Sequence, residues 1–211
     1  MLYLIEIGIA LIITFYFIKR ENPKIKFLYL GYIFFILAMI LQLPFRYLEL
    51  ELSQTIAENL GPTIILSVLT IIVSELTKYF SLKKFLKTKS YKNGILFGIG
   101  WSSIESINFF TANFYYYIFT ILNFELHISP FLGENLSIIS FIFLFVFNLS
   151  LTVLIIIAII KKKIIYVVYS IWLSLIMIYL PIFFNGYVKT GIYITLFLYA
   201  IYLIFKYRNI K

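Results

Sequence analysis

Cysteine and aspartate are both absent from this chain of 211 residues, and histidine occurs only once, at His127. Without cysteine there is no disulfide, no thiol nucleophile and no thiolate to bind a metal ion. One histidine cannot form the cluster of imidazole ligands that zinc sites use. We therefore expect no transition-metal centre and no cofactor, so polar chemistry here has to rest on glutamate, lysine, amide and hydroxyl groups.

Charged residues are scarce as well. They make up 13% of the chain, whereas hydrophobic residues make up 63% and aromatic residues 20%, and the mean hydropathy is +1.00. A soluble domain of this length cannot bury that much apolar surface, because much of any folded surface faces water. No linker, change of composition or internal repeat divides the chain. The sequence predicts one all-α domain, residues 1–211, folded as a polytopic transmembrane helical bundle.

Long apolar stretches are what the chain has instead. A spanning helix needs about 20 mostly apolar residues. About seven stretches qualify, at residues 1–18, 27–45, 61–80, 93–111, 137–160, 164–183 and 191–205. The segment 112–136 contains a run of aromatic residues, which suits an interfacial or re-entrant helix. A further span there would reverse the topology of everything after it.

The positions of the basic residues predict how these spans are oriented. Of the 18 lysines and arginines, 16 lie at the end of the first, third, fifth or seventh span or in the segment that follows it, and only Arg46 and Lys189 lie opposite. Basic residues concentrate on the cytoplasmic side of membrane proteins. We therefore expect the N-terminus outside and the C-terminus in the cytoplasm, in the cell membrane. The lipid bilayer is then the partner of the basic loops, and a nucleic acid is not.

Three glutamates fall inside the expected spans. Glu6 is near the outer end of the first, Glu75 is near the cytoplasmic end of the third, and Glu105 is in the middle of the fourth. A charge in hydrocarbon costs at least ~2.5–3.5 kcal/mol, so each needs a partner, a proton or a water-filled cavity. Lys78 stands one turn after Glu75, and this spacing predicts an ion pair within the helix.

Glu105 has the most unusual position. Gly94, Gly98, Trp101 and Glu105 recur on one helical face. Beside them, Gly98, Ser102 and Ser106 form a stripe of small residues that allows a neighbouring helix to approach closely. We therefore expect Glu105 to face the interior of the bundle, with Asn148 at a matching depth as a hydrogen-bond partner. Such a pair either holds two helices together or lines a functional cavity.

Several short motifs resemble those of the glutamic intramembrane proteases, the group that contains the CAAX prenyl proteases and PrsW. Residues 74–79 (SELTKY) resemble the Glu-Glu-x-x-Arg motif of that group. Residues 98–105 (GIGWSSIE) resemble the Gly-x-Gly-His-Gly-Gly-x-Glu motif of its YhfC branch. Residues 42–44 (QLP), where we expect Pro44 to end the second helix, resemble the His-x-Pro of that branch, and Glu134-Asn135 resembles its Glu-Arg. The resemblance covers roughly residues 27–175.

The departures from these motifs concern the chemistry. Ser74 replaces one of the two glutamates, and Gln42 and Trp101 stand where the family has histidines. Activating water requires a general base and, usually, a histidine or metal that orients the water and stabilises the oxyanion. By the resemblance, Glu75 and Glu105 remain as candidate catalytic bases. The candidates to line the cleft are Lys78, Trp101, Gln42 and Asn148, and no metal site is expected.

Three functions follow from these observations. The first is a catalytically degenerate relative of the YhfC family, which acts as a binding or accessory protein and holds a transmembrane helix of a client, or another membrane subunit, in the former active-site cleft. The second is an active intramembrane peptidase that depends on Glu75 and Glu105. The third is a small proton-coupled transporter or a subunit of a membrane complex, with Glu105 as proton carrier. The lost motifs favour the first, so we expect a protein that is not an enzyme.

Overall fold

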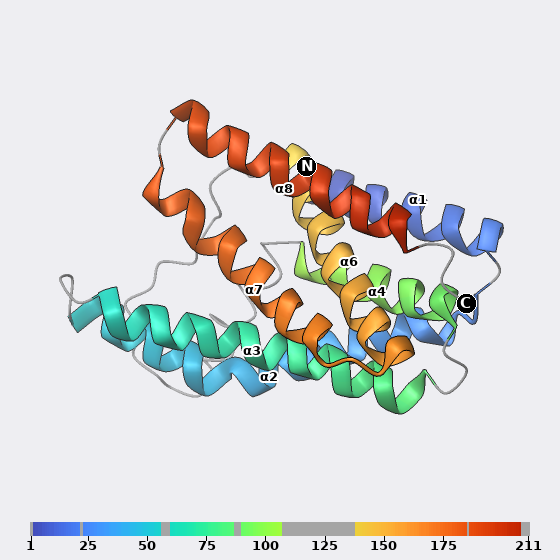
Figure 1. Cartoon of the computed structure of the whole chain (residues 1–211), viewed down its shortest axis with the longest axis horizontal. Helices are drawn as coiled ribbons and strands as arrows, with labels where there is room; N and C mark the ends of the chain where they lie inside the picture. Colours follow the sequence, from blue (N-terminus) through green and yellow to red (C-terminus); the bar gives the residue numbers. More distant parts are fainter. Residues whose placement is uncertain are drawn as a thin grey trace.

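The computed structural model of the chain describes residues 2–21, 23–55, 60–86, 90–106, 138–184 and 186–207 (Figure 1). These ranges contain helices and their connections and no β-strand, as the sequence predicts. The helices are α1 (Leu2–Glu21), α2 (Lys26–Thr55), α3 (Leu60–Phe85), α4 (Tyr91–Glu105), α6 (Ile138–Lys161), α7 (Ile165–Tyr179) and α8 (Gly186–Lys206), with a short 3-10 helix, η1 (Leu180–Phe183), between the last two.

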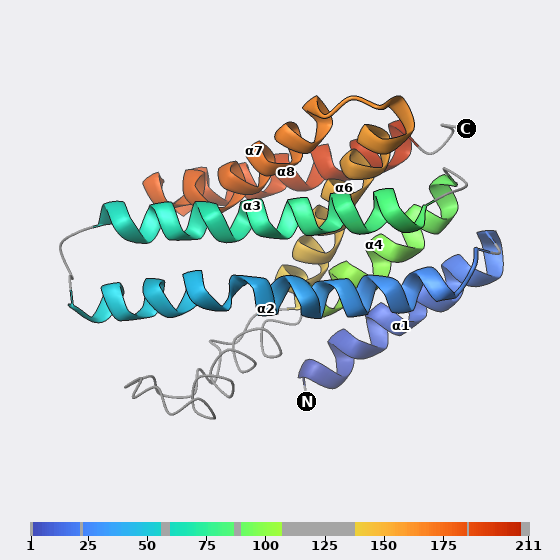
Figure 2. The same ribbon diagram turned by 90° about the horizontal axis from the view of Figure 1, so that it is seen from below.

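Four of these helices contain a segment that is long and apolar enough to cross a membrane: Lys26–Leu48, Ile64–Phe85, Phe141–Lys161 and Tyr187–Lys206. The apolar helix α7 (Ile165–Tyr179) is shorter. Successive helices run in opposite directions, so their termini gather toward the two ends of the bundle (Figures 1 and 2).

Helix α6 forms the centre of the bundle. It packs against α3, α4, α7 and α8, and its side chains from Leu151 to Ala158 are almost all buried. Its sequence is apolar on every side, which suits a helix that is surrounded by other helices. By contrast, α8 packs mainly on α6 and exposes large apolar residues such as Leu198 and Phe205. This exposed apolar surface is what a lipid-facing helix presents.

Glycines set the closest helix contacts. A Cβ atom added at Gly31 of α2 would lie 2.2 Å from the carbonyl oxygen of Phe97, and one added at Gly100 of α4 would lie 2.3 Å from that of Leu28. The backbones of α2 and α4 can approach this closely only because neither glycine has a side chain. On its other side, α4 places Gly98 against Leu149 and Thr152 of α6. The predicted close approach along the small-residue stripe is therefore confirmed at Gly98.

Several predicted boundaries differ from the structure. We predicted that the second span ends near residue 45 at Pro44, but α2 continues to Thr55 with Pro44 inside it. Proline removes only one backbone N–H from the helical ladder, and neighbouring helices can compensate for that loss. Helix α8 begins at Gly186, five residues before the predicted start. The predicted continuation of the fourth span to 111 and the segment 112–136 lie outside the described residues.

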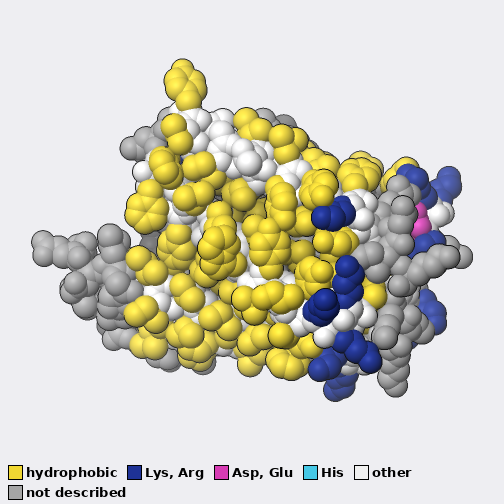
Figure 3. Space-filling model, in the orientation of Figure 1, with side chains coloured by type: hydrophobic (Ala, Val, Ile, Leu, Met, Phe, Trp, Pro, Cys, Tyr) yellow, Lys and Arg dark blue, Asp and Glu magenta, His cyan; other side chains and the backbone are white. Residues whose placement is uncertain are grey.

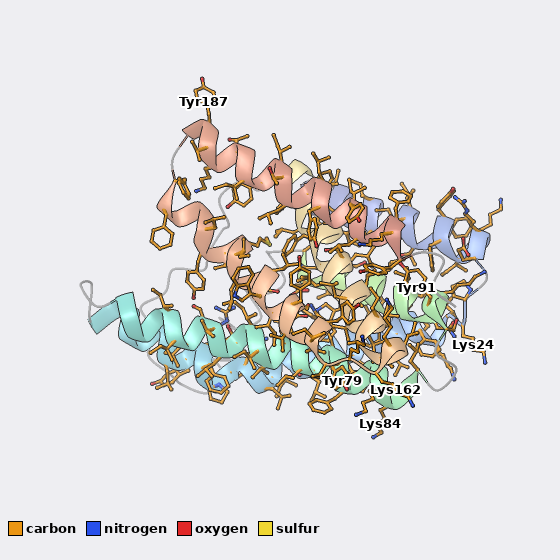
Figure 4. The ribbon with its side chains drawn as sticks, in the orientation of Figure 1. Lys24, Tyr79, Lys84, Tyr91, Lys162 and Tyr187 are labelled. Carbon is orange, nitrogen blue, oxygen red and sulfur yellow. The ribbon has the colours of Figure 1, made fainter. Side chains whose placement is uncertain are left out.

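The surface of the described residues separates into an apolar body and a basic end. Figure 3 shows hydrophobic side chains over most of the visible face and lysine and arginine side chains gathered toward one end. Lys24 and Lys162 come from two connections and Lys84 from the last turn of α3, and all three lie toward that end, whereas Tyr187 projects from the opposite one (Figure 4). We call the end that carries these three lysines the basic end.

Candidate functional site

A buried ion pair lies at the centre of the candidate site. The ammonium nitrogen Nζ of Lys78 donates a hydrogen bond to Oε1 of Glu75, one turn earlier on α3, over 2.7 Å. The side chain of Lys78 is 0% exposed and that of Glu75 is 3% exposed. The predicted ion pair is therefore confirmed, and it lies in the interior of the bundle. A buried charge of either sign is tolerated there because the partner balances it.

The second oxygen of Glu75 also has a partner. Ser170 of α7 is fully buried, and its hydroxyl donates to Oε2 of Glu75 over 2.5 Å. Ser170 is also held by its own helix, because its carbonyl accepts a hydrogen bond from Ser174 over 3.0 Å. Both oxygens of the Glu75 carboxylate are therefore occupied, and the carboxylate links α3 to α7.

Helix α4 brings Trp101 and Glu105 to the same place. The indole nitrogen Nε1 of Trp101 donates to Oε2 of Glu105 over 2.8 Å, and that oxygen lies 3.9 Å from Nζ of Lys78. The ammonium group also lies 5.1 Å from the centre of the Trp101 ring, within the range of a cation–π contact. Phe35 of α2 packs against the Trp101 ring in an edge-to-face arrangement, with the centroids 5.4 Å apart.

We call Glu75, Lys78, Trp101, Glu105 and Ser170 the Lys78 cluster. It joins α3, α4 and α7, although α3 and α4 share no extensive contact of their own and meet chiefly through α2 and α6. The two helices nevertheless touch through side chains, because Lys78 of α3 contacts Trp101 and Glu105 of α4, and the two glutamates share one interior space. Side chains of an α-helix tilt toward its N-terminus, so the Lys78 side chain points back along α3 toward Glu75. There its ammonium group also meets Glu105 of α4.

The two carboxylates of the cluster differ in access. Glu75 is buried with both oxygens bonded, whereas the side chain of Glu105 is 26% exposed and its Oε1 accepts no hydrogen bond from any described residue. In formal charges, the cluster holds two carboxylates and one ammonium group. The negative charge that is not neutralised belongs chiefly to Glu105, because Lys78 is bonded to Glu75. A hydrogen-bond donor or a cation can therefore be received at Glu105 and not at Glu75.

Two other predicted residues have structural roles. Gln42 of α2 donates from Nε2 to the carbonyl oxygen of Thr70 on α3 over 3.0 Å, which ties these helices together five residues before Glu75. Asn148 is buried in α6, but no hydrogen bond joins it to Glu105 within the described part of the chain. The predicted Glu105–Asn148 pair is therefore not formed. Trp101 on the same helix is nearer, and its N–H takes that place.

Two buried serines flank Glu105 in the sequence, Ser102 within α4 and Ser106 as the residue that follows it. The hydroxyl oxygens of Ser102 and Ser106 have no hydrogen-bond partner among the described residues, although both residues are buried. Ser102 stands one turn after Gly98, and Asn148 stands one turn before Thr152, which contacts Gly98. Because α4 and α6 run antiparallel, one turn forward on α4 corresponds to one turn back on α6. Ser102 and Asn148 therefore lie at the same level of the α4–α6 contact. Buried polar groups of this kind are commonly satisfied by ordered water.

Sequence reasoning missed Ser170. The signal was present as the pair Ser170 and Ser174, two polar positions one turn apart on an otherwise apolar helix, but nothing in the sequence indicates that this face meets Glu75. Glu134, Asn135 and His127 lie outside the described residues, as does the side chain of Glu6. Among the described side chains, no group of three or more histidine, cysteine or acidic residues could hold a metal ion.

No family model, no curated protein and no solved structure matches this chain. The class of protein is therefore defined by the fold and the site alone: a helical protein with four helices long and apolar enough to cross a membrane, and with a buried polar cluster that combines two glutamates, a lysine and a tryptophan.

Proposed function

We propose that this protein spans the cell membrane seven times and binds a membrane-embedded client without hydrolysing it. The state of Glu75 is the observation that supports this proposal most strongly. A general base has to reach a water molecule, and one oxygen of its carboxylate has to be free to accept the proton. Glu75 is 2% exposed, and its two oxygens are bonded to Lys78 and Ser170. The residue acts as a structural anion.

The proposed topology places the N-terminus outside and the C-terminus in the cytoplasm. Lys24, Lys84 and Lys162 lie toward one end of the bundle although they are far apart in the sequence (Figure 4). The gathering of basic residues at one end is the pattern expected of a cytoplasmic face. Single-cysteine labelling tests this arrangement cleanly because the chain has no cysteine of its own. Labelling from outside at position 84 or 162 would overturn it.

The proposed binding function depends on Glu105. This residue is partly exposed, it carries the charge that Lys78 leaves unbalanced, and its orientation is set by Trp101. Starting from Asn93, it lies roughly 18 Å along α4, which is about the middle of a bilayer's hydrocarbon core. A carboxylate at that depth can receive a polar or cationic group of a client helix, where the alternative partner for that group would be lipid.

The resemblance to the YhfC branch of the intramembrane proteases agrees with this function. The family positions of the double-glutamate motif and of the following glutamate correspond to Glu75 and Glu105, which lie in one cluster. At the position of a family histidine, Trp101 is fully buried and packs on Phe35, so its ring fills space that a water molecule would need. We infer a bundle that retains the architecture of a protease and has lost the hydrolytic step.

An active peptidase is the second candidate, because Glu105 is accessible and the cationic Lys78 stands at the position of the family's arginine. The test compares the wild type with Glu105→Gln in proteoliposomes that contain single-span substrates. We expect no cleavage by either protein. Cleavage by the wild type alone would establish the peptidase and refute the binding proposal.

Binding is tested in the same membranes with a photoreactive amino acid at Ile104, beside Glu105, or at Phe15, an exposed position on α1. We expect a discrete client to be cross-linked from position 104, lost with Glu105→Gln, and absent from position 15. Equal cross-linking from both positions, or cross-linking that does not depend on Glu105, would contradict a client site at the Lys78 cluster.

A further inference from the structure

Two lysines from different helices converge on one tyrosine ring at the basic end. Lys161 ends α6, and its Nζ lies 5.8 Å from the ring centre of Tyr207 and 5.7 Å from that of Tyr166. Lys206 ends α8, and its Nζ lies 5.5 Å from the ring of Tyr207 and 5.1 Å from that of Tyr202. The Tyr207 ring is therefore within cation–π range of two ammonium groups, which would otherwise repel each other.

Neither lysine has an anionic partner in the part of the chain that the structure describes. Among the described residues of the basic end, the ion pairs involve only Glu21, which contacts Arg20 and Lys92. Lys161 and Lys206 are exposed, and the two residues that follow Lys161 are lysines as well. The local excess of positive charge is therefore available to bind an anionic ligand from outside the chain.

The position of this pair indicates where that ligand comes from. The apolar segments Phe141–Lys161 and Tyr187–Lys206 end at these two lysines, so the pair marks the boundary between the apolar body and the basic end. Two exposed apolar stripes begin beside it and run away from the basic end. They are Ile165, Val168 and Trp172 on α7, and Phe205, Tyr202 and Leu198 on α8.

We propose that Lys161, Lys206 and Tyr207 bind the headgroup phosphate of an anionic phospholipid, with its acyl chains along these stripes. The inference concerns a site other than the Lys78 cluster and rests only on the membrane-spanning arrangement of the proposed function. The two ammonium groups supply charge, the tyrosines supply an amphipathic surface at headgroup level, and the stripes supply apolar contact. A soluble phosphate compound would use the charge but leave the stripes uncovered.

The experiment titrates the delipidated, detergent-solubilised protein with phosphatidylglycerol or phosphatidylcholine and counts bound lipid by native mass spectrometry. The test variant is Lys161→Gln with Lys206→Gln. The matched control is Lys83→Gln with Lys84→Gln, which removes the same charge from the same end, where each lysine contacts only a ring of its own helix. A third variant, Lys161→Arg with Lys206→Arg, retains the charge. Thermal unfolding confirms that each variant is folded.

We expect the wild type to prefer phosphatidylglycerol, and the test variant to bind it about 10- to 30-fold more weakly, since each basic residue near an anionic headgroup contributes to the affinity. The control should change by less than about threefold, and the arginine variant should bind like the wild type. Equal losses in the test and control variants would overturn the site in favour of diffuse charge. If inorganic phosphate displaced bound phosphatidylglycerol as effectively as short-chain phosphatidylglycerol does, the ligand would be a phosphate group in general and the proposal of a lipid site would be wrong.

These outcomes are independent of the proposed client binding. Lipid titration in detergent depends neither on the topology of the protein nor on the accessibility of Glu105. The variant Glu105→Gln should therefore bind phosphatidylglycerol like the wild type. A failure at Lys161 and Lys206 therefore refutes the lipid site alone, whereas a failure of the cross-linking from position 104 refutes the client site alone.

Discussion

Lysine occurs in two contrasting settings in this molecule. Lys78 is fully buried in the middle of the bundle, bonded to Glu75, close to Glu105 and covered by Trp101. Lys161 and Lys206 are exposed at the basic end, contact only tyrosine rings and have no carboxylate partner among the described residues. The lysine charge is thus balanced by a glutamate of the same chain in one region. In the other region it is exposed and can be balanced only by solvent ions or a bound ligand.

The difference follows from the solvent that each region meets. In the apolar interior neither water nor a headgroup can stabilise an ammonium group, so a buried lysine requires a counter-charge within hydrogen-bond distance. At the boundary of the apolar body the long lysine stem can place its charge in water or among headgroups. Substitutions should therefore have large effects on folding at the Lys78 cluster and small ones at the basic end.

The largest expected effect is that of Lys78→Met. Removing the ammonium group leaves Glu75 as a buried charge whose only remaining partner is Ser170, and breaking a buried pair in this way costs about 3–5 kcal/mol. The free energy of unfolding in detergent, measured by circular dichroism during denaturation with sodium dodecyl sulfate, should fall by that amount. Lys161→Met should change it by no more than about 0.5 kcal/mol.

A double variant separates the lost pair from lost packing. Lys78→Met combined with Glu75→Gln removes both charges and keeps an amide that can bond to Ser170, so most of the stability should return. If Lys78→Met and Lys161→Met were equally mild, the contrast between the two regions would be wrong. If the double variant were as unstable as Lys78→Met alone, packing of the lysine stem would be the cause.

An intermediate effect is expected from Trp101→Phe. This change keeps an aromatic ring against Phe35 but removes the N–H that donates to Glu105, and a hydrogen bond to a charged group contributes about 1.5–3 kcal/mol. Trp172→Phe, at an exposed position of α7, should alter the unfolding free energy by less than about 0.5 kcal/mol.

The same two variants report on the position of each ring. The chain contains two tryptophans, so each variant leaves one fluorophore. Trp172 is 60% exposed and Trp101 is 0% exposed. Brominated lipids should therefore quench the fluorescence of the Trp101→Phe protein and spare that of the Trp172→Phe protein. The reverse result would place Trp101 at the lipid surface and remove it from the cluster.

Much of the Lys78 cluster could be predicted because its determinants are local. The pairing of Glu75 with Lys78 follows from helical spacing within α3, and the proximity of Trp101 to Glu105 follows from spacing within α4. That both glutamates face inward follows from the cost of exposing them to lipid. The all-helical architecture likewise follows from long apolar stretches, which have few alternatives when backbone groups need partners within the chain.

What could not be predicted depends on contacts between distant segments. Ser170 meets Glu75 only because α7 packs on α3. Asn148 lies at the level of Ser102 in the α4–α6 contact, about one turn short of Glu105. The predicted end of α2 was wrong because proline usually marks the end of a helix, and we applied this to Pro44. A packed helix tolerates the loss of one backbone hydrogen bond, and α2 continues through Pro44. In the same way, the close approach at Gly31 requires knowing that α2 meets α4.

The smallest expected effect comes from Lys162, in the turn between α6 and α7, and it is stabilising. Lys162 has a φ of 54°, and the N–H of Lys163 donates to the carbonyl oxygen of Ala158 over 3.0 Å, which is the arrangement that usually places glycine at this position. Lys162→Gly and Lys162→Ala remove the same charge, but only glycine adopts this backbone conformation without strain, so the glycine variant should be more stable by about 1 kcal/mol.

Unfolding of the two variants in detergent measures the difference in stability. The control is the comparison of Lys163→Gly with Lys163→Ala, at a position without a positive φ. Equal stability of the glycine and alanine variants at position 162 would contradict the prediction. It would mean that the chain does not hold position 162 at a positive φ, so the turn at the basic end would impose no backbone constraint there.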